Sequence, residues 1–411
     1  MSAGLEAEVA ARAAWSRLAE PGDVVAGALV AGLGAPDALA WLREVGPDVR
    51  SGRVVDLPGT GESARRLTSA ALRWLTRLET LDVARDLRHA ERLGAAVLVP
   101  SAPGWPRALD DLGPAAPACL WVRGATDLAA LCERSVALIG ARACTPYGEH
   151  VTAQLASGVA DAGWTVVSGG AYGVDAVAHR VALASEVPTV AFLAGGVDRP
   201  YPAGNARLLA AMADGGGAVV SEVPPGSVPS RSRFLLRNRL IAAAARATVV
   251  VEAAWRSGAL STAGHAAGLL RPVGAVPGPV TSAASAGCHR LLREGAAVCV
   301  TDAAEVLELA GAADGARAAA EHDAGRATGG VDAGPGRVPP EGGGHVRERL
   351  DLAGLDEPAR RTLDALPVQR AAGLEALARV AGLTVSEVAA ALGTLELAGH
   401  ATSVGSGWRR A

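Results

Sequence analysis

The feature that most constrains this 411-residue chain is an alternation, from about Ala95 onward, of short apolar runs with segments of helical periodicity. The runs lie at 96–99, 120–122, 136–139, 165–167, 189–193, 218–220, 248–251, 273–276 and 297–300. Continuous apolar strands separated by helices of about 10–15 residues indicate a parallel sheet that helices cover on both faces. The sequence therefore predicts an α/β fold, with an extended Rossmann-like, doubly wound core over residues 94–310.

A glycine turn follows one of these strands. The strand at 165–167 runs into Gly169–Gly173 and then into a helix that begins near Asp175. Glycines let backbone N–H groups approach a ligand, and a helix N-terminus favours anions, so we expect a phosphate cradle with Asp175 as the helix cap. Arg142 follows the neighbouring strand at 136–139. Loops at neighbouring strand ends of a doubly wound sheet share one crevice.

The segment from Arg231 to Arg246 holds five arginines, no carboxylate and one phenylalanine, Phe234. Such a segment suits a nucleic-acid strand, since guanidinium groups meet phosphates and the ring offers a stacking face. From these residues alone, a solvated helix face with Phe234 in the core is an equal alternative. Because the segment follows the strand at 218–220, we expect it to form one groove with Arg142 and the glycine turn.

Composition narrows the class of protein. The net charge is −3 and the pI about 6.3, which argues against a broadly basic DNA coat. The chain has no lysine, so every fixed positive charge is an arginine and a Walker phosphate-binding motif is excluded. Five scattered cysteines and the lack of a leader or a long apolar span predict a cytoplasmic protein without a disulfide framework.

Neither the turn at Gly169–Gly173 nor the loop after the strand at 136–139 carries the dinucleotide fingerprint, so we expect no NAD and no other cofactor. His179 and His289 have no third ligand or nucleophile at a suitable spacing, so we expect no metal site and no catalytic triad.

The flanks of the core have their own patterns. Residues 1–93 show helical periodicity, 311–350 are rich in Gly, Ala, Pro and Asp and predict a flexible linker, and 351–411 predict a winged helix. The second helix of that domain carries Glu387 and Glu396 and no arginine, which favours protein contact or structural support over reading a DNA groove.

These motifs together resemble the DNA-processing protein A (DprA/Smf) family. The matching segments are Gly140–Gly148, Ser168–His179, Asp198–Asn205, Ser221–Pro224, Phe234–Arg239, Val251–Ala253, Ser257–Ala263, Ala275–Gly278 and Gly287–His289. They run in order across nearly all of residues 95–300. Ala141 departs from the hydroxyl residue often found before the arginine of the first motif, and Arg231 and Arg233 stand where the family can have lysine.

The resemblance implies a protein that binds and protects single-stranded DNA and loads the RecA recombinase during natural transformation and DNA recombination. It also implies a SAM-like helical domain at 1–93, a homodimer, and no enzymatic activity. The implied strand-binding residues are Arg142, Ser168, Gly169, Gly170, Gly173, Asn205, Arg231, Phe234, Arg237, Asn238 and Arg239. The expected dimer surface lies around Cys288–Val300, where one of Leu291 and Leu292 should face outward.

A second interpretation is an enzyme. Rossmann cores with glycine cradles also occur in phosphoribohydrolases that cleave nucleoside monophosphates, and Glu252, at the end of a strand, is the candidate acid. A structural carboxylate that ties loops together at the sheet edge is the favoured reading of that residue.

Overall fold

The computed structural model describes residues 3–56, 63–311, 357–367, 372–381, 383–397, 400–404 and 407–410. The chain divides into two compact units, residues 1–329 and 330–411. The linker predicted over 311–350 lies outside the described residues, apart from Gly311. The domain boundaries predicted from the sequence stay predictions.

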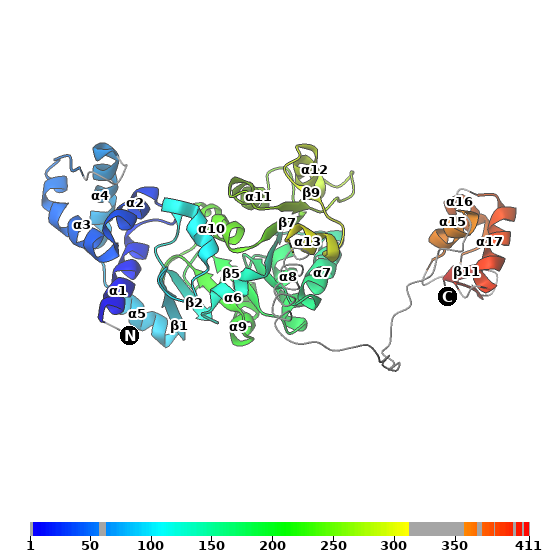
Figure 1. Cartoon of the computed structure of the whole chain (residues 1–411), viewed down its shortest axis with the longest axis horizontal. Helices are drawn as coiled ribbons and strands as arrows, with labels where there is room; N and C mark the ends of the chain where they lie inside the picture. The colour runs from blue at the N-terminus through cyan, green and yellow to red at the C-terminus, as the bar shows by residue number, and fades with distance from the viewer. Residues whose placement is uncertain are drawn as a thin grey trace, which may run out of the picture. The chain divides into compact units, whose positions relative to one another are not determined.

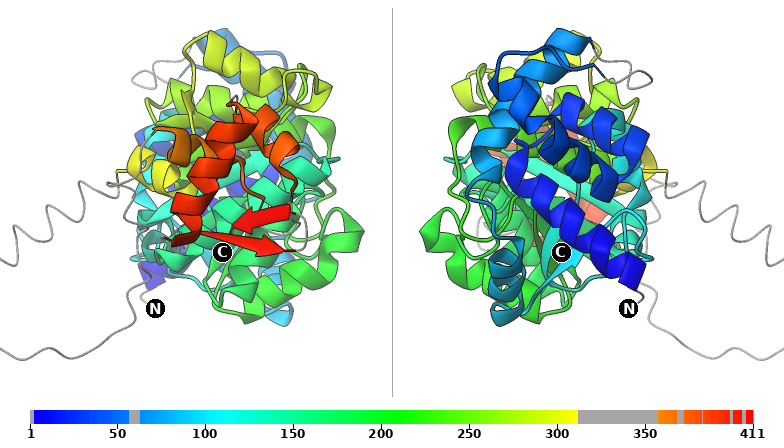
Figure 2. Two further views of the ribbon diagram at one scale, coloured as in Figure 1. Left: turned by 90° about the vertical axis from the view of Figure 1, so that its right-hand side faces the viewer. Right: turned by 90° about the vertical axis from the view of Figure 1, so that its left-hand side faces the viewer.

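Helices form the beginning of the first unit. They are α1 (Ala3–Leu18), α2 (Val24–Leu33), α3 (Ala35–Arg50), α4 (Ala64–Leu78) and α5 (Val83–Arg92). Their core contains Trp15 and Trp74, whose rings meet edge to face at 5.2 Å between centroids. A smaller cluster joins Ala13 and Ala90 to Trp121 of the sheet. The helices therefore rest on one end of the sheet, beside β1 and β2 (Figures 1 and 2).

No single helix among the described residues is long and apolar enough to cross a membrane. By length and composition alone α2 and α3 pass together as a pair, but the pair bends by 110° and both helices contribute buried residues to the helical core.

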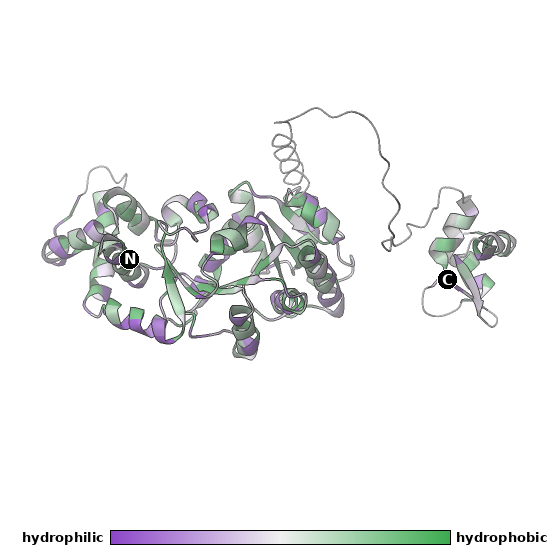
Figure 3. Cartoon of the chain, turned by 60° about the horizontal axis from the view of Figure 1, so that its bottom comes forward, coloured by the Kyte–Doolittle hydropathy of each residue, from purple (hydrophilic) through white to green (hydrophobic). Residues whose placement is uncertain are grey.

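The central sheet has the strand order β1-β2-β6-β5-β4-β3-β7-β8-β9. The strands are β1 (Ala95–Leu98), β2 (Leu120–Gly124), β3 (Ser135–Gly140), β4 (Thr165–Ser168), β5 (Thr189–Leu193), β6 (Ala218–Ser221), β7 (Ala247–Glu252), β8 (Val273–Ala275) and β9 (Val298–Cys299). Each overlaps one of the apolar runs in the sequence, which confirms the predicted strands. The strands carry mostly hydrophobic residues, whereas the helices also carry hydrophilic ones (Figure 3).

The sheet is mixed, and the prediction of a wholly parallel sheet is wrong at one end. From β6 to β9 neighbouring strands are parallel, but β1 pairs antiparallel with β2 and β2 pairs antiparallel with β6. The reason lies in the connection between β1 and β2. It contains only the 3₁₀ segment η1 (Arg107–Ala115), without the crossover α-helix by which parallel neighbours are usually joined.

Helices cover both faces of the sheet. One face packs against α6 (Leu128–Glu133), α10 (Arg231–Ala244), α11 (Ala259–Gly268) and α12 (Ala286–Arg293). The other packs against α7 (Pro146–Asp161), α8 (Val174–Ala184), α9 (Ala206–Asp214) and α13 (Ala303–Leu309). Two short 3₁₀ turns, η2 (Ala203–Asn205) and η3 (Ala283–Ser285), complete this unit. Alternate side chains of each strand are thus buried against different helices, as in doubly wound folds.

The strand order reverses direction between β3 and β7. After β3 the chain proceeds to β4, β5 and β6 on one side, and after β6 it crosses to β7, β8 and β9 on the other. Ligands of doubly wound sheets bind at such a switch point, in the crevice outside the carboxyl ends of the strands. The loops that follow β3 and β7 flank this crevice.

The second unit contains α15 (Glu357–Ala365), α16 (Leu374–Ala381), α17 (Val385–Leu397) and the hairpin of β10 (Ala401–Val404) and β11 (Gly407–Arg410). Its apolar core draws on all three helices and on β10, with Leu363, Leu377 and Leu395 almost fully buried. Three helices followed by a hairpin match the predicted winged helix.

Candidate nucleic-acid interface

The carboxyl ends of β3, β4 and β7 face a groove with a volume of about 790 Å³. Its walls come from the loop after β3, the glycine turn after β4, α10 and the loop after β7. The charged, amide and aromatic side chains in this lining are Arg142, Asp175, Tyr201, Arg231, Phe234, Arg237, Asn238 and Arg256. Arg142 thus shares one groove with Arg231 and Arg237 of the arginine segment. The other members of the implied strand-binding set that are outside its lining are Ser168, Gly169, Gly170, Gly173, Asn205 and Arg239.

The glycine turn is held by Asp175. This carboxylate accepts hydrogen bonds from the backbone N–H groups of Gly169 (3.2 Å) and Ala171 (3.3 Å). The N-cap of α8 is Gly173, so Asp175 lies in the first turn of the helix and the prediction that it caps the helix is wrong. Burial raises the pKa of Asp175, against the opposing charge of Arg237. Two N–H groups of the predicted phosphate cradle therefore already have partners within the protein.

Two further residues of the implied strand-binding set are buried and bonded to the backbone. The hydroxyl of Ser168 donates to the carbonyl of Leu138 (2.7 Å). The amide of Asn205 donates to the carbonyls of Gly170 and Ala171, both at 3.0 Å. These contacts fix the shape of the glycine turn.

Arg237 lies under the groove. It is buried, and its guanidinium donates to the carbonyls of Gly169 (2.8 Å) and Phe192. A Cβ added to Gly169 would lie 2.5 Å from a guanidinium nitrogen, so this position must be glycine for the arginine to fit. Burial lowers the pKa of Arg237 to about 10, with Asp175 opposing the shift and Arg142 adding to it. Arg237 therefore remains charged at neutral pH and adds positive potential to the groove floor.

Arg239, by contrast, is committed to an internal ion pair. It is 4% exposed and lies 2.5 Å from the carboxylate of Glu222, which is also buried. Gly22, in the turn before α2, packs against the same guanidinium, since a Cβ there would lie 3.1 Å from Nε. Arg239 therefore holds the N-terminal helices, α10 and the end of β6 together.

The exposed part of the site is a stack of one arginine and two aromatic rings. The guanidinium carbon of Arg142 lies 4.7 Å from the ring centroid of Phe234. On the same ring packs Tyr201, at 5.4 Å between centroids and with 49% of its surface exposed. Arg142 itself is exposed. Cation–π contact of this kind holds both groups in place.

The other groove residues differ in exposure. Arg231, in the first turn of α10, is exposed, and Ser230 caps that helix by accepting from the N–H of Arg233. Asn238 is buried and donates to the carbonyl of Gly258 (3.3 Å), which ties α10 to the loop after β7.

Sequence reasoning did not assign a role to Tyr201 or Arg256, both exposed groove residues. Tyr201 lies in a recognised motif, which is the only signal that could have found it.

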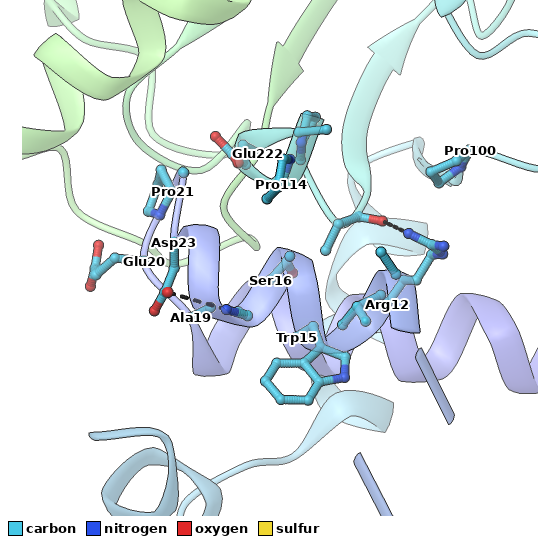
Figure 4. Close-up of a pocket in the computed structure, with 18 of the residues that line it drawn as sticks. Arg12, Trp15, Ser16, Ala19, Glu20, Pro21, Asp23, Pro100, Pro114 and Glu222 are labelled. Atoms are coloured by element: carbon cyan, nitrogen blue, oxygen red, sulfur yellow. Dashed lines mark hydrogen bonds between the residues drawn. The ribbon is translucent and has the colours of Figure 1, made fainter. Parts of the chain in front are cut away.

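A second, smaller cavity of about 160 Å³ lies between α1, α2 and η1. Figure 4 shows Glu20 and Asp23 at one end of it and Glu222 on the side of the sheet. Three carboxylates and one arginine, Arg12, make this cavity a poor site for phosphate. The groove at the strand ends, about 790 Å³ in volume, is therefore a better candidate site than this cavity.

Glu252 acts inside the fold. It is 1% exposed, and its carboxylate accepts from the backbone N–H (2.8 Å) and the hydroxyl (2.7 Å) of Thr145, at the start of α7. A Cβ added to Gly148 would lie 2.5 Å from the same carboxylate. Glu252 therefore ties the loop after β3 to β7 and does not face a substrate site.

The two histidines of interest also have structural partners. His179 is fully buried, hydrogen-bonds Thr189 (2.8 Å), and burial lowers its pKa to about 3. His289 bonds the carbonyl of Gly278 (2.9 Å). Among the described residues, no group of three or more His, Cys, Asp or Glu could hold a metal ion.

The predicted dimer surface lies on α12. Leu291 is 7% exposed and packs in the sheet core, whereas Leu292 is only partly buried and lies at the margin of that core. Val298 of β9, the last strand of the sheet, is 58% exposed.

Comparison with known proteins places the chain in a family. The family model for DNA recombination-mediator protein A matches residues 96–311, more than half of the chain. A DprA protein of Mycobacterium tuberculosis is 41% identical over 404 residues, which cover 96% of this chain and 92% of that protein. The chain belongs to the DprA/Smf family.

Other DprA/Smf proteins match over part of the chain. The Smf protein of Escherichia coli is 40% identical over 192 residues, 47% of this chain and 50% of that protein. The X-ray structure of DprA from Streptococcus pneumoniae matches with a TM-score of 0.52 at 31% identity, covering 66% of this chain and 91% of that one. The DprA winged helix domain matches residues 347–407. The resemblance, the Rossmann-like fold and the C-terminal winged helix predicted from the sequence are confirmed.

Proposed function

We propose that the protein binds single-stranded DNA in the groove at the carboxyl ends of β3, β4 and β7. The observation that carries this proposal is the stack of the exposed Arg142 and Tyr201 on the partly buried Phe234. A nucleic-acid strand requires cations along its backbone and flat faces for its bases, and this stack offers both at one place. Arg231 and Arg256, exposed in the same groove, supply further phosphate contacts.

The residues of the implied strand-binding set have two different roles in this proposal. Arg142 and Arg231, which are exposed, and Phe234, which is partly buried, line the groove and contact the strand. Those that are buried shape the groove: Arg237 adds positive charge from below, and the glycine turn, Ser168, Asn205, Asn238 and Arg239 act through the internal hydrogen bonds and the ion pair described above.

Unpaired bases fit this groove better than a duplex does. A duplex hides its base faces, so the rings of Phe234 and Tyr201 could not stack on them. A net charge of −3 also disfavours non-specific binding of duplex DNA through its phosphates alone. Binding should therefore be selective for single strands and independent of base sequence.

The proposal includes no catalytic activity. The acid of the alternative phosphoribohydrolase interpretation, Glu252, is buried and accepts two hydrogen bonds from Thr145. Asp175, the carboxylate that lines the groove, accepts hydrogen bonds from the glycine turn. Neither is free to activate water in this arrangement.

In the cell, such a protein would act as a recombination mediator in the cytoplasm, protecting incoming single strands and loading RecA onto them, as the family resemblance implies. We include a homodimer through α12 and β9 in the proposal, on the basis of the partly exposed Leu292 and the exposed Val298. Light scattering at micromolar concentration tests the dimer, and a monomer mass would remove it.

Binding selectivity is the direct test of the proposed function. Fluorescence anisotropy should show tight binding of oligothymidine and weak binding of a duplex of equal length, with no release of phosphate from ATP. The variant Arg142→Ala should weaken binding of the single strand. Equal affinity for both DNA forms, or an unchanged affinity in the variant, would contradict the proposal.

A further inference from the structure

A tryptophan stands exposed beside the groove. Trp255, in the loop after β7, has 53% of its surface exposed. The structure describes all eight tryptophans of the chain, and the other seven are buried or partly buried. An indole ring that is half open to solvent next to a nucleic-acid groove is able to stack on a base.

The ring is held firmly from one side. The guanidinium carbon of Arg290 on α12 lies 5.1 Å from the ring centroid, and the same side chain donates to the carbonyl of Trp255 at 3.5 Å. Its Nε is buried and has no hydrogen-bond partner among the described residues, which leaves the contact with the ring as one of its main interactions. Arg290 thus fixes one side of Trp255 and leaves half of the side chain open.

The loop that carries Trp255 is also fixed. Gly287 at the start of α12 donates its N–H to the carbonyl of Ala253 (2.7 Å), and a Cβ added there would lie 2.8 Å from the carbonyl of Ala254. On the other side Asn238 of α10 bonds the carbonyl of Gly258. A loop anchored at both ends presents the ring in one orientation, which reduces the entropy lost on binding.

The charges around the ring favour a polyanion. The next residue along the chain, Arg256, is exposed and lines the groove. Arg290 lies beneath the ring, and Arg293 is exposed one turn further along α12, against a single carboxylate, Glu294, that is 3.9 Å from Arg290. The phosphates of a nucleic-acid strand carry the opposite charge, so such a strand fits this surface.

We propose that Trp255, Arg256 and Arg290 form a second base-stacking site that extends the groove across the switch point of the sheet. One base of the strand stacks near Phe234 on the β3–β4 side, the backbone passes Arg256, and a later base stacks on Trp255 on the β7 side. This inference rests on the proposed function, because the ligand is the same single strand. The strand then follows a path that extends beyond the stack of Arg142, Phe234 and Tyr201.

Tryptophan fluorescence tests the site directly, since Trp255 is the exposed tryptophan and base stacking quenches indole emission. Oligothymidine should quench the emission of the parent protein, and the quenching should disappear in Trp255→Phe, which keeps a ring and much of the affinity. Trp255→Ala should bind an oligothymidine of about 20 nucleotides roughly 5- to 150-fold more weakly, which corresponds to about 1–3 kcal/mol for one stacked base. An oligomer of about 4 nucleotides, the lower end of single-strand site sizes, should bind equally well to both because it occupies only the first stack.

Three results separate the possible failures. If Arg142→Ala weakens binding but Trp255→Ala changes neither affinity nor quenching, the second site is wrong and the proposed function stands. If the parent protein does not bind oligothymidine at all, the proposed function itself fails. If Trp255→Ala instead converts a dimer into a monomer in light scattering, the ring serves a second copy of the chain and the inference is overturned.

Discussion

Removing Arg142 and removing Phe234 should weaken DNA binding in two distinguishable ways. Three exposed arginines line the groove, Arg142, Arg231 and Arg256. If each meets one phosphate, the slope of log affinity against log salt should be about −2 in the parent, since each contact with a single strand adds about −0.7. Arg142→Ala should bring that slope to about −1.4.

The difference in slope is large enough to measure over a practical salt range. Between about 50 and 200 mM salt, one phosphate contact accounts for a loss of roughly 2.6-fold in affinity, so Arg142→Ala should lose that much less than the parent. Phe234→Ala removes a stacking face and should lower affinity by about 1–3 kcal/mol at every salt concentration, with the parental slope. Anisotropy titrations of oligothymidine at four or five salt concentrations measure both quantities.

Arg134 provides a matched control. It is also exposed and its guanidinium also lies over an aromatic ring, that of Trp164, at 5.5 Å. It precedes β3, at the amino edge of the sheet and away from the groove. Arg134→Ala should therefore keep the parental slope and affinity. If Arg142→Ala behaves like Arg134→Ala, the strand does not pass the groove and the stack of Arg142 and Phe234 is only structural.

Further predictions concern stability. Arg239→Ala should lower the free energy of unfolding by about 3–5 kcal/mol in urea titrations, because it leaves the carboxylate of Glu222 buried and unpaired; a loss below 1 kcal/mol would contradict the buried ion pair. Gly173→Val should prevent folding, judged by expression and circular dichroism, since a Cβ there would lie 2.1 Å from the carbonyl oxygen of Ala141 and the φ angle is +74°. His179 has a pKa of about 3 when folded, below its unfolded value, so protonation favours the unfolded chain. As the pH falls from about 6.5 to 5, the parent should therefore lose about 2 kcal/mol more stability than His179→Gln, and equal losses in urea titrations would contradict this assignment. Glu20→Gln should weaken the contact of α1 with α10 by under about 1 kcal/mol, because the ion pair with Arg233 is partly exposed; the effect should vanish at acidic pH, where Glu20 is protonated.

The pH dependence expected for Glu20→Gln follows from two opposing influences on the pKa of Glu20. Burial raises its pKa, but hydrogen bonding and attraction by Arg233, with a smaller contribution from Arg77, outweigh burial and lower it overall. A carboxylate whose pKa falls on folding stabilises the protein above its unfolded pKa, and this contribution is lost as the pH drops through the folded value.

Local patterns were sufficient for much of the fold. Strand runs such as Val190–Leu193 are apolar throughout because both faces of the sheet are covered, and that makes them visible in the sequence. The antiparallel β1 and β2 were not predictable in the same way. Strand direction depends on the path of the connecting chain, and the apolar pattern of a buried strand carries no direction.

The candidate site was only partly predictable. The arginine segment identified α10, but the four arginines of this helix look alike in the sequence. Their partners lie far away along the chain, such as Gly169 for Arg237 and Glu222 for Arg239. Which arginine is exposed depends on those partners. The Asp175 cap failed for a related reason, since its carboxylate turns toward the glycine turn preceding α8.

The contact between the turn before α2 and α10 also determines how a shortened protein would behave. Gly22 covers the guanidinium of Arg239, and Glu20 neutralises Arg233. A chain that begins near residue 94 would open both arginines to solvent. Arg239 would keep its partner Glu222, but Arg233 would lose Glu20 and would present new positive charge on α10. Its affinity for DNA could then exceed that of the full-length protein for reasons unrelated to the native site. Comparisons of DNA binding between shortened and full-length chains are therefore informative only when Arg233 is also replaced in both.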